Sequence, residues 1–131
     1  MAEHKKSLRK DFRRLKKSFL YAVKGIKEVF QREQNIKIQL VLTLVVIYYG
    51  LFLHIGSLEF AILFVAIAQV LSLETINTAF EIYLDEKEKE QSETIAVIKD
   101  ILAAGVLVSV IFAVIIGSII FLPPSLKLLG V

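Results

Sequence analysis

The chain has 131 residues, 56% of which are apolar, and its mean hydropathy is +0.67. Soluble proteins are about 45–50% apolar, so this composition indicates a single-domain membrane protein. It argues against a soluble three-helix protein, whose helices would need polar faces. The chain has no cysteine, which excludes disulfides, thiolate metal sites and palmitoylation. The net charge is only +3, but the positive charges are unevenly distributed.

Most of the lysines and arginines lie in residues 1–37. Apolar side chains recur among them at spacings of three and four residues, including Phe12, Phe19, Ile26 and Phe30. This pattern predicts a basic amphipathic helix at the membrane surface, where each Lys or Arg contributes about 1 kcal/mol of attraction to anionic lipid. Such a helix can also bind nucleic acid or a calmodulin-like partner, but its position directly before an apolar span favours the lipid surface.

Three long apolar segments follow, and we expect transmembrane helices at about 38–55, 59–81 and 101–122. A short turn at His54–Ser57 separates the first two, and the charged segment 85–90 must lie in water between the second and third. Pro123 and Pro124 are expected to end the third span. The basic N-terminal segment places that end of the chain in the cytoplasm, so the second and third spans should meet on the cytoplasmic side.

Three polar side chains share one face at the end of the second span. Glu74, Asn77 and Glu81 are spaced at i, i+3 and i+7, and a helix places the two carboxylates roughly 10 Å apart along its axis. Ionisable groups inside an apolar span are costly and are usually functional. The alternative, in which Glu74 and Asn77 bond each other or neighbouring helices and only fix the packing, remains open.

The predicted topology brings Glu33, Lys99 and Asp100 to the same membrane face as this polar stripe. Carboxylates beside a lysine suit Mg²⁺ and a polyphosphate, because magnesium takes one or two carboxylates and completes its shell with phosphate and water. Glu74, the deeper of the two carboxylates on the stripe, could take the proton from a lipid hydroxyl, and Glu81 could hold the metal. The sequence has no G-x-x-x-x-G-K-[ST] loop and no H-E-x-x-H motif.

The sequence resembles a family of small prokaryotic integral-membrane lipid kinases that comprises diacylglycerol kinase and undecaprenol kinase. The family's central motif is similar to E-x-x-N-[ST]-A-x-E with an Asp four residues on. It also has a K-G pair, a Glu eight residues after that Gly within E-x-N, and a K-D pair before a helix of small residues. The matching segments are residues 74–81 with Asp85, Lys24–Gly25, Glu33–Asn35, Lys99–Asp100 and residues 103–105. The resemblance covers roughly residues 10–124.

The resemblance implies an all-α membrane protein that assembles as a homotrimer of three-span subunits, each with an N-terminal surface helix. It also implies transfer of the γ-phosphoryl group of ATP, with Mg²⁺, to a lipid alcohol. By matching position, Glu74 would be the general base, and Glu33 and Glu81 would bind Mg²⁺. Five further residues would contact or position the nucleotide: Asn77, Lys99, Asp100, Arg14 and Tyr21.

Ile36, Gln39 and Leu102 depart from the family's pattern, which affects the lipid fit and the packing beside Asp100. The context of Glu33 and the C-terminal run resemble the Gram-positive members, so undecaprenol is the expected substrate and diacylglycerol is the alternative. A non-catalytic membrane adaptor, in which the basic helix binds anionic lipid and the polar stripe joins helices, is an alternative of another class. A lipid phosphatase is disfavoured because no His or Ser nucleophile accompanies the acidic cluster.

Overall fold

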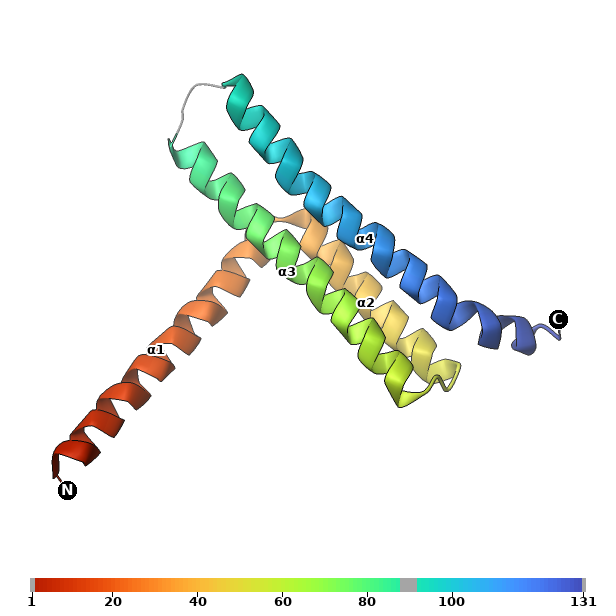
Figure 1. Cartoon of the computed structure of the whole chain (residues 1–131), viewed down its shortest axis with the longest axis horizontal. Helices are drawn as coiled ribbons and strands as arrows, with labels where there is room; N and C mark the ends of the chain where they lie inside the picture. Colours follow the sequence, from red (N-terminus) through yellow and green to blue (C-terminus); the bar gives the residue numbers. More distant parts are fainter. Residues whose placement is uncertain (1, 88–91, 131) are drawn as a thin grey trace.

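The computed structural model describes residues 2–87 and 92–130, and these residues form helices without any strand. The helices are α1 (Ala2–Arg32), α2 (Gln34–Phe52), α3 (Ser57–Lys87) and α4 (Glu93–Leu128). Helices α2, α3 and α4 lie side by side in a bundle, and α1 projects away from it at an angle (Figure 1). The all-α class predicted from the sequence is confirmed.

The three bundle helices are each long and apolar enough to cross a membrane. Many of their large apolar side chains face outward, and Leu44, Val65 and Phe112 are each more than 60% exposed. Such a surface is unfavourable in water, but the hydrocarbon core of a bilayer covers it, while the backbone polar groups are satisfied within each helix. The protein is therefore an integral membrane protein with three candidate spans, as the hydropathy of the sequence predicts.

The helices of the second and third spans are longer than the apolar segments that mark them. Helix α3 continues to Lys87, into the charged segment that we expected to lie in water, and α4 begins at Glu93 rather than near residue 101. Glu and Lys are good helix formers, so a helix does not have to end where its apolar residues end. At the start of α4, the Ser92 side chain caps the helix by accepting a hydrogen bond from the amide of Ile95 at 3.3 Å. The rest of that charged segment, residues 88–90, lies outside the described residues.

The prediction that Pro123 and Pro124 end the third span is wrong, because α4 continues through both of them to Leu128. A proline removes a backbone donor, but in membrane helices serine hydroxyls and neighbouring helices can stabilise the disturbed turn. Here the Ser125 hydroxyl donates to the carbonyl of Phe121 at 2.6 Å and is hydrogen bonded to the Tyr49 hydroxyl of α2 at 2.8 Å. The rings of Tyr49 and Phe121 also pack together, with centroids 5.2 Å apart.

A tight turn joins α2 to α3 at the predicted position. His54 adopts a left-handed backbone conformation, with φ of 53°, and the amide of Ile55 donates to the carbonyl of Gly50. A side chain on Gly50 would meet atoms of Ile55 and Phe60 at 3.0 Å, so glycine allows the two helices to approach closely here. The turn reverses the chain, and α3 then packs against both α2 and α4.

Candidate active site

The predicted polar stripe lies on the buried face of α3. Glu74 is only 3% exposed, Asn77 and Thr78 are also buried, and Glu81 is partly buried. The hydroxyl of Thr78 donates to the carbonyl oxygen of Glu74 at 2.9 Å, as a helical threonine commonly does to the residue one turn earlier. Because of their spacing these residues share one face of α3, and that face places the carboxylate of Glu74 in the interior of the bundle.

Glu74 and Asn77 do not bond each other; each has a different partner. The Gln39 side-chain amide of α2 donates from Nε2 to Glu74 Oε2 at 3.2 Å, and Asn77 Nδ2 donates to Glu81 Oε1 at 2.8 Å. The opposite ends of the two amides, Gln39 Oε1 and Asn77 Oδ1, are buried and have no hydrogen-bond partner among the described residues. Such an unpaired acceptor costs about 1–3 kcal/mol of folding free energy. The two oxygens are therefore available to a donor or a cation.

Glu33 occupies the junction between α1 and α2, where its backbone is extended and its side chain does not cap the helix that follows. Burial raises the pKa of the Glu33 carboxyl above its ordinary value of 4.5, and the negative charges of Glu81 and Glu74 raise it further. Three carboxylates from two separate segments thus share one electrostatic environment. Glu33 therefore lies within electrostatic range of Glu74 and Glu81, and the roles that the sequence analysis assigned to these three residues remain predictions.

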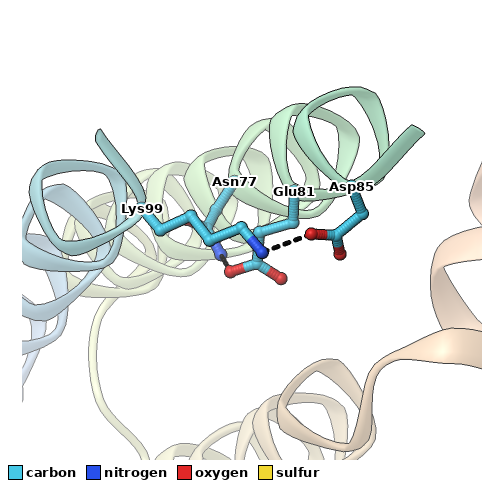
Figure 2. Close-up of polar contacts among 4 residues, drawn as sticks. All are labelled: Asn77, Glu81, Asp85 and Lys99. Carbon is cyan, nitrogen blue, oxygen red and sulfur yellow. Dashed lines mark hydrogen bonds and ion pairs between the residues drawn. The ribbon is translucent and has the colours of Figure 1, made fainter. Parts of the chain in front are cut away.

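Lys99 reaches from the first turns of α4 towards α3 and forms an ion pair with Asp85. Figure 2 shows its side chain extending along the face of α3 that carries Asn77, Glu81 and Asp85. The side chain of Asp85 is 66% exposed, and ion pairs in contact with solvent are weak, so a phosphate group can compete for the ammonium. Asp100, the next residue on α4, is exposed and is rotated by about 100° around the helix axis.

Arg14 and Tyr21 lie on α1, and both are exposed. The segment that carries them projects away from the bundle (Figure 1), so a single chain does not bring these two residues to the carboxylates. The apolar side chains on the same helix are also exposed, with Phe12 at 72% and Phe19 at 70%. This helix therefore requires a further surface, either a lipid headgroup layer or another copy of the chain, to cover its apolar residues.

The acidic residues suit a metal that arrives with a phosphate ligand. Among residues 2–87 and 92–130, no group of three acidic, His or Cys side chains is close enough to hold a metal alone. Magnesium needs only one or two carboxylates when a phosphate and water complete its shell. Glu33 and Glu81, with the unpaired Asn77 Oδ1 next to Glu81, fit that mode of binding. Their assignment as metal ligands remains a prediction.

An apolar groove of about 510 Å³ begins at Gln39, the hydrogen-bond partner of Glu74. It lies between α2, α3 and α4, and its apolar lining includes Leu42, Val46, Ile67, Leu71, Val114 and Phe121. Gln39, the partner of Glu74, lines the groove near one end, and Ser125, the partner of Tyr49, lines it near the other. The sequence analysis noted Gln39 only as a departure from a family pattern. The available signal was its position as the one amide side chain in the apolar run 38–53, one turn before Thr43.

The structure thus places a buried carboxylate, Glu74, beside a residue that lines an apolar groove, within a bundle of helices able to span a membrane. Residues 20–121 match the family model for prokaryotic diacylglycerol kinase. The chain belongs to this prokaryotic diacylglycerol kinase family and is thus a lipid kinase, a phosphotransferase with an alcohol group as acceptor. This assignment confirms the resemblance seen in the sequence and favours an enzyme over the non-catalytic adaptor.

Two characterised relatives are similar over most of the chain. An undecaprenol kinase from Bacillus subtilis is 32% identical over 118 residues, which cover 90% of this chain and 96% of the relative. A diacylglycerol kinase from Synechocystis sp. is 35% identical over 113 residues, which cover 86% of this chain and 65% of the relative. The names of the two relatives differ in the lipid alcohol, so their percentage identities do not establish the substrate of this chain.

Proposed function

We propose that the protein transfers the γ-phosphoryl group of ATP, in the presence of Mg²⁺, to the hydroxyl group of undecaprenol. The observation that carries this proposal is the position of Glu74. Its carboxylate is almost fully buried, is hydrogen bonded by a residue that lines the apolar groove, and lies close enough to Glu33 to affect its ionisation. Glu74, as the proton acceptor for an alcohol, thus lies between the apolar groove, which suits a hydrocarbon chain, and the carboxylates of Glu33 and Glu81, beside which metal-bound phosphates would lie.

In the proposed reaction Glu74 takes the proton from the alcohol while the alcohol oxygen attacks the γ-phosphorus, and the bond from that phosphorus to the bridging oxygen of ADP breaks. Asn77, Lys99 and Asp100 contact and position the phosphates. Lys99 exchanges its exposed partner Asp85 for a phosphate oxygen, which needs little energy because both partners remain in contact with water. Mg²⁺, when it is bound by Glu33 and Glu81, supplies neutralisation of the phosphate charge.

Arg14 and Tyr21 complete the proposed nucleotide site from α1. Because α1 exposes its apolar residues, we propose that assembly as a homotrimer gives this helix a second chain to pack against. We expect the protein to be a multi-pass protein of the plasma (inner) membrane with its N-terminus in the cytoplasm. The concentration of Lys and Arg in the first 37 residues supports this orientation.

Undecaprenol is favoured over diacylglycerol by the extent of the similarity to the two relatives. The match to the undecaprenol kinase spans 96% of that protein, whereas the match to the diacylglycerol kinase spans 65%. The diacylglycerol kinase is nevertheless slightly more identical over the matched residues, at 35% against 32%. Diacylglycerol, with phosphatidic acid as the product, is therefore the second candidate.

A direct assay tests the proposal. Purified protein in mixed micelles is given γ-labelled ATP, Mg²⁺ and either undecaprenol or diacylglycerol, and the labelled lipid is measured. We expect labelled undecaprenyl phosphate. Exclusive labelling of the diacylglycerol would overturn the substrate assignment, and transfer of label to neither alcohol would overturn the proposed reaction.

The role of Glu74 has its own test. Glu74→Gln should lower the turnover by about 10²–10⁴-fold, the usual contribution of a general base, without changing the oligomeric state. Glu86→Gln, which neutralises an exposed carboxylate on the same helix, is the matched control and should retain normal turnover. Wild-type turnover by the Glu74→Gln protein would show that another group takes the proton.

A further inference from the structure

We propose that α3 packs against α3 of a second copy of the chain, and that the Gln69 carboxamides of the two copies hydrogen bond to each other in the middle of the bilayer. This inference rests on the proposed function, because the homotrimer supplies the second copy, and it assigns the face and the polar contact through which the copies meet. The observation that carries it is an amide side chain exposed at a level where hydrocarbon would surround a single chain.

Gln69 lies deep within the second candidate span. Counted from Ser57 at 1.5 Å per residue, it stands about 18 Å along α3, and a hydrocarbon core about 30 Å thick that begins at Ser57 has its middle near this point. The Gln69 side chain is exposed, and it has no hydrogen-bond partner among residues 2–87 and 92–130. An unpaired amide is strongly disfavoured in hydrocarbon, and this side chain is too short to reach water from the middle of the bilayer. A protein surface therefore covers Gln69 better than lipid does.

The chemistry of the amide favours an identical partner. A carboxamide is complementary to itself, because it carries both a carbonyl acceptor and N–H donors. All copies of a membrane protein insert in the same direction, so the rotation axis that relates them runs along the membrane normal and keeps equivalent residues at equal depth. Gln69 of the partner subunit therefore reaches this level without any shift of one copy along the other. A hydrogen bond between side-chain amides of membrane helices stabilises their association.

The face of α3 next to Gln69 allows another helix to approach closely. Small or β-branched side chains follow one another along it at alternating intervals of four and three residues: Ala61, Val65, Ala68, Ser72, the half-buried Thr75 and Ala79. This repeat of 3.5 residues is the one with which two helices pack at a small crossing angle, and small residues bring membrane helices close together. Gln69 lies at the edge of this face, beside Ala68. The outward faces of α2 and α4 carry large residues instead, such as Leu44 and Phe112.

A hollow beside Gln69 fits the same partner. It has a volume of about 270 Å³, lies between α3 and α4, and is lined by apolar side chains apart from Gln69. The side of a second helix offers both apolar side chains for the hollow and an amide for Gln69, whereas a lipid tail offers only the first.

Cysteine cross-linking tests the contact directly, because the chain has no cysteine of its own. We expect Gln69→Cys protein in phosphatidylcholine vesicles, treated with a membrane-permeant oxidant or a short bismaleimide, to form covalent dimers on a denaturing gel. Leu44→Cys is the matched control. Gln39 of α2 meets Glu74 of the antiparallel α3, so Leu44 lies level with Gln69, and it is also exposed. It should remain monomeric on the gel. Equal cross-linking at both positions, or none at Gln69→Cys, would overturn the proposal.

Gln69→Leu measures the contribution of the amide. Loss of one hydrogen bond between membrane helices should weaken association of the copies in detergent by about 3–30-fold, as measured by sedimentation equilibrium. Gln69→Asn keeps a carboxamide and should associate more tightly than Gln69→Leu. Association of Gln69→Leu as tight as that of wild type would show that the amides of the two copies do not meet.

Ala68→Ile tests the close approach of the two helices. Ala68 is exposed, so a larger side chain there points away from its own bundle and should leave the single chain folded. We expect this variant to sediment mainly as a monomer under conditions in which the wild type is oligomeric. Leu44→Phe enlarges an exposed residue at the same level on α2 and should keep the wild-type mass. A wild-type mass for Ala68→Ile would place the contact between copies on another face.

Cross-linking and mass together separate this inference from the proposed homotrimer. A trimeric wild type whose Gln69→Cys variant does not cross-link would contradict the α3 contact and leave the homotrimer standing. A dimeric wild type whose Gln69→Cys variant does cross-link would contradict the homotrimer and leave the α3 contact standing. A wild type that is monomeric in lipid would contradict both, and the lipid phosphorylation assay would still test the reaction by itself.

Discussion

The two ends of the groove bury polar side chains in opposite ways. At the end formed by the turns around Tyr49 and Ser125, the hydroxyl groups bond each other and a backbone carbonyl. At the end formed by Gln39 and the stripe on α3, the amides of Gln39 and Asn77 each use one atom and leave a buried oxygen unpaired within residues 2–87 and 92–130. The first end is a completed structural contact. The second retains acceptors that a ligand, a water molecule or another copy of the chain can satisfy.

We attribute this difference to the proposed chemistry, which requires unpaired polar groups at one end of the groove at the expense of stability. Unpaired buried acceptors lower stability, and sites of this kind persist where function requires them. Substitutions at the site end should therefore reduce activity more than stability, and substitutions at the Tyr49 end should do the reverse. The predictions below test this separation, beginning with the largest expected effect.

At the site end, Asn77→Leu should abolish most activity without weakening the fold. It removes both a group proposed to contact the nucleotide and an unpaired buried oxygen. We expect kcat/KM to fall by more than about 100-fold, while the unfolding temperature in detergent stays equal to that of wild type or increases. Parallel assays of lipid phosphorylation and thermal unfolding check the two parts. A large loss of stability would mean that the Asn77 to Glu81 hydrogen bond is mainly structural.

At the opposite end, Tyr49→Phe should reduce stability and spare activity. It removes the hydroxyl that joins α2 to Ser125 but keeps the ring that packs against Phe121. The loss of one hydrogen bond should lower the unfolding free energy by about 0.5–1.5 kcal/mol. Chemical denaturation of the solubilised protein measures this change, and the turnover of the folded fraction should match that of wild type. A large fall in turnover would show that the Tyr49 end also affects the chemistry.

The smallest expected effect concerns the pH dependence of stability that Glu33 confers. Its pKa in the folded protein is raised above 4.5 by burial and by the charges of Glu81 and Glu74. As the pH rises above that value, the unfolded chain loses the proton first, so ionisation of Glu33 opposes folding. The stability of the wild type relative to Glu33→Gln should therefore be highest at low pH and decrease as the pH rises through the raised pKa.

Thermal unfolding of both proteins at a series of pH values, without and with Mg²⁺ and a non-hydrolysable ATP analogue, measures this difference. With the metal and nucleotide, the stability of the wild type relative to Glu33→Gln should fall less as the pH rises, because a cation beside Glu33 stabilises its charged form. A relative stability that increases with pH would show that a positive charge, rather than the carboxylates of Glu74 and Glu81, dominates the surroundings of Glu33.

Local spacing and hydropathy in the sequence were enough to predict three long apolar helices and the stripe on α3. The interval between Glu74, Asn77 and Glu81 fixes their common face whatever surrounds the helix. Partners that depend on packing between distant segments were not predictable in this way. Gln39 meets Glu74 across 35 residues, and Lys99 meets Asp85 across 14. The continuation of α4 through Pro123 and Pro124 likewise accompanies a contact with Tyr49, which no local pattern reveals.

The length of α3 bears on how one protein can bind both a lipid in the bilayer and a nucleotide in water. Counted from Ser57 at 1.5 Å per residue, Glu74 lies about 26 Å along the helix and Glu81 about 36 Å. A hydrocarbon core is about 30 Å thick, so if α3 enters the bilayer at Ser57 the two carboxylates fall on either side of its boundary. The lipid alcohol that accepts the phosphoryl group and the ATP that donates it would then meet along one helix, while the alcohol stays in the bilayer and the ATP stays in water.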